Sequence, residues 1–403
     1  MTGRRRIAIA GGGIGGVALA CCLVRRGHEV RLFERAPAFG EVGAGIQMTP
    51  NAITAVKALG LMDDVLKVGF LPNAVVGRNW KSGRENFRIP LKGVCERLYD
   101  APFIHIHRAD MHAVFARHVP EGVVEFGRSV SGVTSTERGA VLTFEDGGSY
   151  EADLVVGADG VRSAVRGALF GPEDPKFTGH MCYRALVPTG GVVDYVSPDS
   201  SFWMGPNGHV VTYYVNGGRA VNIVAVSETK AWVEESWNAP SSRAEMMASF
   251  EGWHPNLLKL FSQVGDVYRW GLFDRDPMPR WSKGAVTLLG DAAHPMLPFL
   301  SQGAAMAIED AFVLGAALDR PGLSLEAALA AYEAERRPRT SRVQLEARER
   351  GRTYHLPTPW AQAKRDFVYW VKGIFKPRAT GIGTDWVYEY DVRRFAGAAP
   401  GSH

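Results

Sequence analysis

Apolar residues at the start of the chain form short continuous runs that are separated by glycines and polar turns. The run RRIAIA (5–10) predicts a buried strand, and IGGVALACCLVRR (14–26) predicts a helix that ends at Gly27. EVRLFER (29–35) then predicts a second strand. Strand, helix and strand in this order make one βαβ unit, so the chain is expected to begin with an α/β domain.

Strands and helices continue to alternate after this unit. A glycine-rich loop, EVGAGIQMTPN (41–51), leads into a helical stretch, and EADLVVGADG (151–160) is an apolar strand that runs into a glycine loop. AVTLLGD (285–291) is a third apolar strand of this kind. The other expected elements are helices at 52–61, 109–119, 302–318 and 324–350, strands at 73–80, 85–91 and 103–108, and a meander before 151.

Between about 172 and 270 the chain is mostly strand-like, with two amphipathic helical stretches near 243–264. The expected fold class is α/β (α+β), a Rossmann-like nucleotide-binding domain with an inserted, mostly β domain and C-terminal helices. Residues 1–171 are expected to form the first part of the nucleotide-binding domain, with 71–97 contributing to the substrate side. Residues 172–269 would form the β-rich substrate domain, and residues 270–350 the second part of the nucleotide-binding domain. The pattern does not place the tail, residues 351–403.

Composition and charge exclude some classes of protein. With 46% hydrophobic and 22% charged residues, the chain is neither disordered nor fibrous. Its net charge of +4 comes from basic residues that are spread along the chain, so no nucleic-acid partner is expected. The four cysteines, Cys21, Cys22, Cys95 and Cys182, form neither a disulfide framework nor a metal-ligand spacing. We therefore expect a cytoplasmic monomer or homodimer.

The N-terminus superficially resembles a secretion signal, because Arg4-Arg5-Arg6 precedes an apolar segment. Five glycines interrupt that segment, and a strand pattern follows it directly. No other stretch reaches the roughly 18 apolar residues that a membrane-spanning helix needs. We therefore interpret the segment as part of the fold and expect no membrane span.

Gly11, Gly13 and Gly16 form the pattern G-x-G-x-x-G between the first strand and the first helix. The first glycine permits a tight turn, the second lets a pyrophosphate approach the backbone, and the third allows close packing of helix on strand. Glu34 ends the next strand and can accept hydrogen bonds from ribose hydroxyls. Glycine patterns alone are common, but this one, with its strand, helix and acid, predicts a dinucleotide site.

Two further strands end in comparable loops. Asp159-Gly160 follows one apolar strand and Gly290-Asp291 follows another, after which residues 298–303 open a helix. With these motifs, and with the stretches FGEVGAGIQ and IHRADMHA, the chain resembles the single-component (class A) flavin-dependent aromatic hydroxylases of the p-hydroxybenzoate hydroxylase fold. The resemblance covers nearly the whole chain and is nearest to 6-hydroxynicotinate 3-monooxygenase, 3-hydroxybenzoate 6-hydroxylase and salicylate hydroxylase.

The resemblance implies that all three loops bind one FAD. Glu34 would bind the adenosine ribose, Arg108 would reach the ribityl and pyrophosphate region, and Asp291 would hydrogen-bond the ribityl chain. The N–H groups near Gly303 and Ala304 would face the flavin, where its reduced form is anionic. The full set of cofactor residues that the resemblance implies is Gly11, Gly13, Gly16, Glu34, Arg35, Gln47, Arg108, Asp159, Asp291, Pro298, Gly303 and Ala304.

The resemblance also implies a reaction. NAD(P)H, with NADH favoured, would reduce FAD, and O2 would then give a flavin hydroperoxide that hydroxylates a small hydroxy-aromatic or hydroxypyridine carboxylic acid. CO2 would leave if the attacked carbon carries the carboxylate. Only one full glycine fingerprint is present, so NAD(P)H is expected to dock transiently. Transfer of an electrophilic oxygen favours a deprotonated ring hydroxyl, which calls for a base and a dry site.

His209 and Tyr213 are the candidate catalytic residues. Alternate residues of a strand share a face, so HVVTYY (209–214) would direct His209, Val211 and Tyr213 to one side, and related hydroxylases carry a His and a Tyr at this spacing. The alternative is an ordinary sheet with a hydrogen-bonded His and a packed Tyr. The other expected pocket walls are Gln47, Met48, Trp203, Leu297 and Phe299, of which Gln47 and Phe299 stand where nicotinate-type enzymes carry His.

Three charged or titratable residues near these motifs receive structural interpretations. Arg184 is a possible partner for a substrate carboxylate, although an exposed structural role is favoured. Asp159 would brace the loops rather than react. His294 lies in the loop after Gly290 without a neighbouring nucleophile or a second His at metal-ligand spacing, so we interpret it as part of the loop scaffold.

Three other functions stay open at this point. A NAD-dependent dehydrogenase would use the glycine fingerprint but would leave both later loops unexplained. Another flavoenzyme on this fold, such as an epoxidase or a reductase acting on a non-acid ring, would use the same motifs, whereas a halogenase would need a Trp-x-Trp-x-Ile-Pro stretch that the sequence lacks. A flavin-binding sensor would need no His and Tyr pair.

Overall fold

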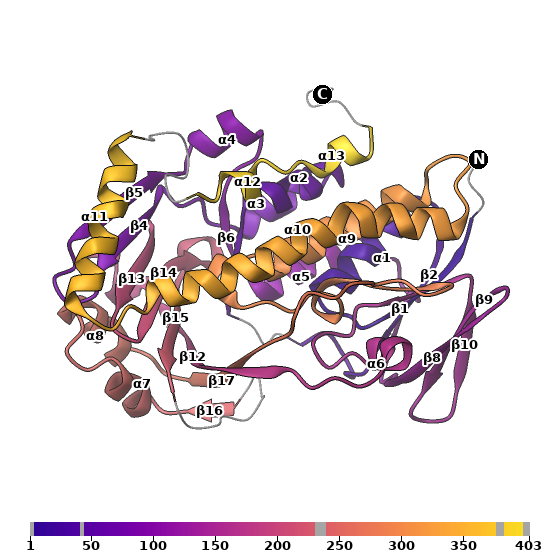
Figure 1. The fold of residues 1–403 in the computed structure, drawn as a ribbon, viewed down its shortest axis with the longest axis horizontal. Coiled ribbons are helices and arrows are strands. Elements are labelled where there is room, and N and C mark those ends of the chain that lie inside the picture. Colours follow the sequence, from indigo (N-terminus) through magenta and orange to yellow (C-terminus); the bar gives the residue numbers. More distant parts are fainter. Residues whose placement is uncertain (1–3, 41–43, 230–238, 376–382, 398–403) are drawn as a thin grey trace.

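Two large sheets and a long helix that extends across both build the protein (Figure 1). The computed structural model describes residues 4–40, 44–229, 239–375 and 383–397, so Glu41, Val42 and Gly43 of the expected loop at 41–51 lie outside the described residues. A parallel sheet covered by helices accompanies a mostly antiparallel sheet. This arrangement confirms the predicted fold class.

The first sheet is parallel throughout, with the strand order β18-β11-β1-β2-β7. The apolar runs that predicted β1 and β11 are buried along almost their whole length, as expected for central strands of a parallel sheet. The five strands are β1 (Arg6–Ala10), β2 (Glu29–Glu34), β7 (Val124–Phe126), β11 (Leu154–Gly157) and β18 (Val286–Leu288).

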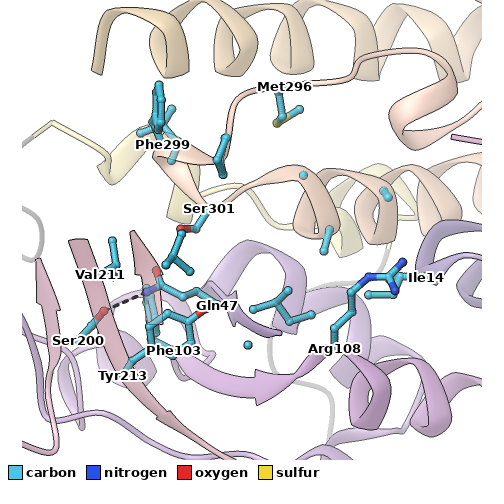
Figure 2. Close-up of a pocket in the computed structure, with 18 of the residues that line it drawn as sticks. Ile14, Gln47, Phe103, Arg108, Ser200, Val211, Tyr213, Met296, Phe299 and Ser301 are labelled. Atoms are coloured by element: carbon cyan, nitrogen blue, oxygen red, sulfur yellow. Dashed lines mark hydrogen bonds between the residues drawn. The ribbon is translucent and has the colours of Figure 1, made fainter. Parts of the chain in front are cut away.

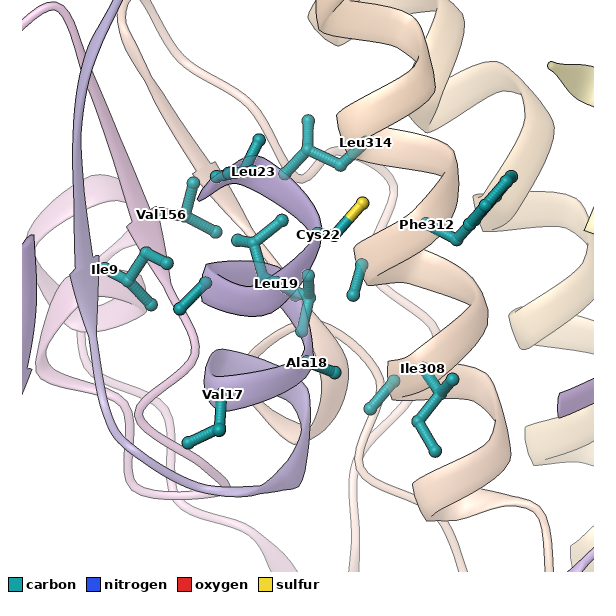
Figure 3. Packing of buried hydrophobic residues seen from close by; sticks show 14 of the residues in the cluster. Ile9, Val17, Ala18, Leu19, Cys22, Leu23, Val156, Ile308, Phe312 and Leu314 are labelled. Carbon is teal, nitrogen blue, oxygen red and sulfur yellow. The ribbon is translucent and has the colours of Figure 1, made fainter. Parts of the chain in front are cut away.

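Helix α1 (Ile14–Arg25) lies between this sheet and helix α9 (Gly303–Leu318) (Figure 3). A glycine on α9 allows the two helices to approach closely: a Cβ added at Gly315 would lie 2.7 Å from Sγ of Cys22 on α1. Cys21 and Cys22 are completely buried, which confirms them as core residues. The contact places α9 directly against α1.

Smaller elements complete this half of the protein. An antiparallel sheet of three strands packs on the parallel sheet through Phe33, whose ring lies 4.8 Å from that of Phe144. A short antiparallel pair connects the two halves. These elements are β8 (Val130–Thr136), β9 (Gly139–Phe144), β10 (Ser149–Ala152), the pair β3 (Gly45–Met48) and β6 (Ile104–His107), and helices α2 (Pro50–Ala58), α3 (Met62–Val68), α4 (Val94–Tyr99), α5 (Arg108–Ala116) and α6 (Ala164–Phe170).

The second sheet has eight strands in the order β16-β17-β12-β15-β14-β13-β4-β5. Helices α7 (Arg243–Ser249) and α8 (Pro255–Ser262) cover one of its faces with an apolar cluster that includes Trp203, Tyr214 and Phe261. The strands are β4 (Ala74–Asn79), β5 (Glu85–Pro90), β12 (Lys176–Pro188), β13 (Ser200–Gly205), β14 (Gly208–Val215), β15 (Ala220–Glu228), β16 (Ala239–Ser241) and β17 (Val267–Asp274).

The strand order bears on the domain boundaries. Strands β4 and β5 come from the segment 71–97 and pair with β13 and with each other in the second sheet. Strand β17 crosses the expected boundary at 269/270 and pairs with β12. We therefore propose that the substrate domain extends through β17, with the division otherwise as expected from the sequence.

The described residues from α9 onward are mostly helical. Helix α10 (Leu325–Tyr354) runs past α9 toward the second sheet, and α11 (Pro359–Phe375) packs beside β5 (Figure 1). The two short helices α12 (Asp385–Tyr388) and α13 (Val392–Phe395) follow. Within the part of the chain that the structure describes, no helix combines the length and apolarity of a membrane span.

Candidate active site

The three motif loops meet at one edge of the parallel sheet. Strands β1, β11 and β18 are adjacent and parallel, so the loops that follow them leave the sheet on the same side. Gly13, Gly160 and Gly290, one from each loop, line the same cavity. The loops are far apart in the chain, and the sheet order brings them together.

Two glycines of the fingerprint serve contacts that no side chain could make. Gly11 has φ +102°, and a Cβ there would lie 2.5 Å from the carbonyl oxygen of Ala158 in the second loop. A Cβ at Gly16 would lie 2.0 Å from the carbonyl oxygen of Gly11. Gly13 is different, because a Cβ there would have no other atom within 4 Å, and this glycine lines the cavity. The first and third glycines thus hold the loop, and the second leaves room for a ligand.

Two acidic residues at or beside these loops, Glu34 and Asp159, are held by hydrogen bonds from nearby groups of the chain. Glu34 accepts hydrogen bonds from the N–H groups of Gly12 (2.7 Å) and Ala36 (2.8 Å). Asp159 accepts from the hydroxyl of Ser163 (2.5 Å) and from the N–H of Val165 (3.1 Å). Burial raises the pKa of Asp159, and these hydrogen bonds oppose that shift. The position of Asp159 fits the bracing role that was predicted for it.

A cavity of about 360 Å³ extends from these loops to the second sheet. Figure 2 shows Arg108 and Ile14 at one end and Val211 and Phe299 at the other. The volume falls within the range of small-molecule sites. Among the predicted site residues, those that line the cavity are Gly13, Gln47, Arg108, Arg184, His209, Tyr213, Asp291, Pro298, Phe299, Gly303 and Ala304.

The end of the cavity near the parallel sheet suits an anionic, nucleotide-like group. The side chain of Arg108 lies there, and burial together with the charge of Arg184 lowers its pKa. Gly303 and Ala304 place the N-terminus of α9 at the cavity, where the helix dipole favours negative charge. Asp291 faces the same space, and desolvation raises the pKa of its carboxyl group. Glycine backbone, a cation and a helix N-terminus together fit the phosphates, the ribityl chain and the ring edge of FAD.

The other end of the cavity contains both predicted catalytic residues. His209 and Tyr213 lie on β14, are almost completely buried and line the cavity together with Val211. The three side chains therefore lie on one face of β14, as predicted. Burial, together with the nearby imidazoles of His355 and His180, holds the pKa of His209 well below its usual value. Burial raises the pKa of the Tyr213 hydroxyl.

Polar groups also stand among the apolar side chains of this end. Gln47 donates a hydrogen bond to the hydroxyl of Ser200 (2.9 Å), and both side chains face the cavity (Figure 2). Arg184 is half-buried, its guanidinium lies 4.4 Å from the ring centre of Trp270, and its Nε has no hydrogen-bond partner among the described residues. The favoured expectation of an exposed structural Arg184 is wrong, because the strand β12 directs this side chain inward.

Several predicted wall residues lie elsewhere. On β13, Ser200 and Phe202 line the cavity, so the alternation of the strand directs Trp203 to the opposite face, where it packs in the cluster beneath α7 and α8. Leu297 and Met48 are buried in apolar clusters behind the lining. Arg35 is exposed and does not line the cavity, so its cofactor role stays a prediction, as does the ribose contact of Glu34.

The C-terminal segment contributes residues that the sequence did not predict. Tyr354, Thr384 and Tyr388 line the cavity, although the tail from 351 had no expected place. Phe87 and Phe103 add further aromatic walls. No motif marks any of these residues, and Tyr354, Thr384 and Tyr388 reach the site only through the packing of α10 and α12.

His294 does not reach this cavity. Its side chain is buried, and its Nε2 lies 2.6 Å from the carboxylate of Asp310 on α9. The same carboxylate accepts a hydrogen bond from the N–H of Gly290 (3.1 Å). His294 therefore fastens the Gly-Asp loop to α9, which is the scaffold role expected from the sequence.

Comparison with known proteins agrees with this geometry. Residues 4–347 match the family described as FAD binding domain. The chain is 41% identical to the 3-amino-4-hydroxybenzoate 2-monooxygenase of Streptomyces platensis, over 90% of this chain and 92% of that one. It is 38% identical to the 6-hydroxynicotinate 3-monooxygenase of Bordetella bronchiseptica, over 97% of each chain. The chain belongs to the FAD-dependent aromatic monooxygenases.

A solved structure extends this result to the whole fold. The complex of salicylate hydroxylase with its substrate has a TM-score of 0.81 and 28% identity, and the match covers 99% of each chain. Membership of the family confirms FAD as the cofactor and a flavin-dependent monooxygenase as the enzyme class. The dehydrogenase and sensor interpretations are therefore wrong.

Changing Gly16 to Ala is expected to remove most of the bound FAD, because the new methyl group would overlap the carbonyl oxygen of Gly11 and force the fingerprint loop open. The visible flavin spectrum of the purified protein measures the occupancy. Gly167→Ala is the matched control: it lies within α6 and has no atom within 4 Å of the added methyl, so FAD content should be unchanged. Normal flavin content in Gly16→Ala would contradict the packing role of this glycine.

Proposed function

We propose that this enzyme hydroxylates a small hydroxy-aromatic or hydroxypyridine carboxylic acid, with NAD(P)H as the reductant and O2 as the oxidant. The observation that carries the proposal is the buried pair of His209 and Tyr213 on the cavity wall, opposite the loops that fit FAD. The names of the similar enzymes state ring acids as substrates, among them 3-amino-4-hydroxybenzoate and 6-hydroxynicotinate. A ring of this size also suits the aromatic end of the cavity.

His209 would remove the proton of the ring hydroxyl. Its pKa is lowered by burial and by neighbouring imidazoles, so the ring is neutral at physiological pH and can accept a proton. Loss of that proton makes the substrate richer in electrons and prepares it for attack by an electrophilic oxygen. A hydroxyl group is therefore the feature of the substrate that this side of the cavity would recognise.

Tyr213 would orient the substrate. It lies four residues after His209 on the same face of β14, and its raised pKa keeps the phenol protonated. A protonated phenol can donate a hydrogen bond to a ring oxygen and stabilise the negative charge that forms there. The ring of His105 packs 4.5 Å from that of Tyr213 and fixes its position.

Arg184 would pair with the carboxylate of the substrate. Its guanidinium faces the cavity and its Nε is buried without a hydrogen-bond partner among the described residues, so a bound carboxylate would satisfy it. The Gln47 and Ser200 pair offers a second polar contact. The other walls at this end, Phe202, Val211, Val224 and Phe299, are apolar and would keep water out.

FAD, when bound, supplies the redox chemistry by taking two electrons from NAD(P)H and passing one oxygen atom of O2 to the substrate. The protein would hold it with the fingerprint loop, Arg108, Asp291 and the N-terminus of α9. NADH as the favoured reductant, transient docking of that reductant, release of CO2 from a carboxylated carbon, a monomeric or homodimeric state and a cytoplasmic location all stay predictions from the sequence.

A panel of ring acids tests the proposed function. Purified protein with its flavin spectrum recorded is mixed with NADH or NADPH and with salicylate, 3-hydroxybenzoate, 4-hydroxybenzoate, 6-hydroxynicotinate or 3-amino-4-hydroxybenzoate. One acid should accelerate NAD(P)H oxidation and give a product that is one oxygen heavier or has oxygen in place of the carboxylate. Benzoate, which lacks the hydroxyl, and phenol, which lacks the carboxylate, are the controls. A yellow protein that hydroxylates phenol as well as any acid would contradict the role of Arg184 and the acid assignment.

A further inference from the structure

His209 is hydrogen-bonded to a second buried histidine. Its Nδ1 lies 2.7 Å from Nε2 of His355, and the two rings are stacked with their centres 5.0 Å apart. His355 follows the end of α10, in the segment that the sequence pattern left unplaced. Its backbone carbonyl accepts a hydrogen bond from the N–H of Asn207 (3.2 Å), which fixes it beside the turn before β14. The pair thus connects the wall of the cavity with the C-terminal helices.

His355 in turn faces a carboxylate at the surface. Its Nδ1 lies 3.5 Å from Oε1 of Glu228 at the end of β15. The side chain of His355 is 1% exposed and that of Glu228 is 45% exposed, so this contact joins the interior to solvent. Nδ1 of His355 is buried and has no hydrogen-bond partner among the described residues. A small rotation of the exposed carboxylate would complete the hydrogen bond that this nitrogen lacks.

The chain of contacts sets which nitrogen of each ring carries a proton. If Nδ1–H of His355 donates to Glu228, then Nε2 of His355 must accept from Nδ1–H of His209. The remaining nitrogen of His209, Nε2, then has a free lone pair. This is the form that a base on the cavity wall needs.

The surroundings also make His209 a poor place to keep a proton. Burial and the facing imidazoles of His355 and His180, from β12, lower its pKa. Burial, His180 and Arg365 from α11 lower the pKa of His355 to about 3. Burial raises the pKa of Glu228, which is the one acidic group that faces the pair in the described structure. Neither histidine therefore retains an added proton, and Glu228 is the acceptor that borders solvent.

We propose that His355 and Glu228 form a proton relay that carries the substrate's hydroxyl proton from His209 to solvent. This inference rests on the proposed function, because it needs His209 to be the base. The O–H bond of the substrate breaks as an N–H bond forms at Nε2 of His209. The Nδ1–H of His209 passes to Nε2 of His355, and the Nδ1–H of His355 passes to the carboxylate of Glu228 and then to water. No electrons are transferred in these steps, and the charge left behind is the phenolate.

Proton release on substrate binding tests the relay without turnover. Oxidised holoenzyme in weak buffer is mixed in a stopped-flow instrument with the acid identified by the panel, and the phenolate band and a pH-indicator dye are recorded. In wild-type protein the band and the released proton should appear together. In His355→Phe, which keeps a ring but cannot carry a proton, both should be slowed about 10- to 100-fold. Glu228→Gln should slow release less, because water can reach His355 in its place.

Further measurements separate a relay from a structural role. Imidazole added to the buffer should restore the rate in His355→Ala, since a small diffusible base can replace the missing ring. His118→Gln is the matched control: this histidine contacts Asp64 through Nε2 (2.9 Å), is partly exposed and does not line the cavity, so the rate should stay close to wild type.

Each outcome has a distinct meaning. If wild-type protein shows no phenolate band with any ring acid, the proposed role of His209 fails, and the relay fails with it. If the band forms normally in both wild type and His355→Phe, the relay alone is overturned.

A chelator control tests for a bound cation. The side-chain atoms of His180, Glu228 and His355 that could bind a metal ion lie within 4.8 Å of one another. Loss of proton release after treatment with EDTA would also overturn the relay, because a bound cation would occupy the nitrogen that must pass the proton.

Discussion

Replacing His209 with glutamine is expected to lower kcat for hydroxylation by about 10²- to 10⁴-fold, the range that a positioned general base contributes. Glutamine keeps a hydrogen-bonding group at a similar position but cannot take up a proton. The loss should shrink as the pH rises toward about 10, because a free phenol ionises in that range without a base. Product formation measured across pH, with the ring acid identified by the panel, checks both the size of the loss and its pH dependence.

The neighbouring tyrosine provides the comparison. Tyr213→Phe keeps the buried ring that packs on His105 and removes only the hydroxyl, so KM should rise more than kcat falls. Both variants should contain normal FAD, since neither residue belongs to the loops that fit the cofactor. A kcat for His209→Gln close to that of wild type would contradict the role of His209 and would favour the ordinary-sheet interpretation of β14.

The meeting of the three motif loops at one cavity could be predicted from the sequence, for a physical reason. The motifs are local, because a tight loop needs glycine at fixed positions along the chain. Gly11 is needed for its positive φ, and Gly16 is needed because it packs against backbone. The strands before these loops are buried on both faces and appear as apolar runs. Once three such strands belong to one parallel sheet, their loops must meet. The position of Asp291 follows from that geometry, and Gly303 begins the helix after the same loop.

The substrate half was predicted less completely. Strand alternation correctly put His209 and Tyr213 on one face, but the rule was not applied to β13, where Phe202 lines the pocket and the predicted wall residue Trp203 lies on the opposite face. The face of a strand that is buried by helices and the face that borders a cavity are both apolar in the second sheet. Composition therefore cannot separate them.

No local sequence pattern predicts the C-terminal residues that contribute to the site. His355, Tyr354 and Tyr388 reach the site because α10 is long enough to cross from the first sheet to the second and α12 returns to it (Figure 1). Helix α10 also contains Pro338 and alternates in charge, so its sequence shows no apolar face that would indicate its neighbours. Tertiary packing decides these contacts, and a proton path that depends on them is visible only in the structure.

A buried network of charges underlies the Gly-Asp loop. Glu309 and Asp310 on α9 and Arg336 on α10 are completely buried, and Arg336 forms ion pairs with both carboxylates. Burial would raise the pKa of Asp310, but the charges of His294 and Arg336 outweigh it and lower the pKa. Arg339 adds a second partner to Glu309 (2.8 and 3.0 Å). The loop that presents Asp291 to the cavity is thus anchored through His294 to a set of charges that can exist in the interior only together.

Replacing Arg336 with methionine is therefore expected to lower the free energy of unfolding by about 3–5 kcal/mol, the cost of removing one partner from a buried ion-pair network. Methionine fills much of the same space, so the loss comes from charge rather than from a cavity. Urea unfolding followed by circular dichroism, with FAD held at one fixed excess concentration, gives the difference from wild type. Arg352→Met is the matched control on the same helix, because the pair of Arg352 with Glu349 is exposed and should contribute about 0–1 kcal/mol.

The pH dependence of this difference follows from the lowered pKa values. Carboxylates whose pKa is lower in the folded than in the unfolded protein stabilise the fold above the unfolded value of about 4, and this contribution disappears as the pH falls through the folded value. The difference in the free energy of unfolding between wild type and Arg336→Met should accordingly be largest at pH 7 and become smaller at acidic pH. A gap of the same size at low pH, or one no larger than that of Arg352→Met at pH 7, would mean that Arg336 stabilises the protein by packing and not by charge.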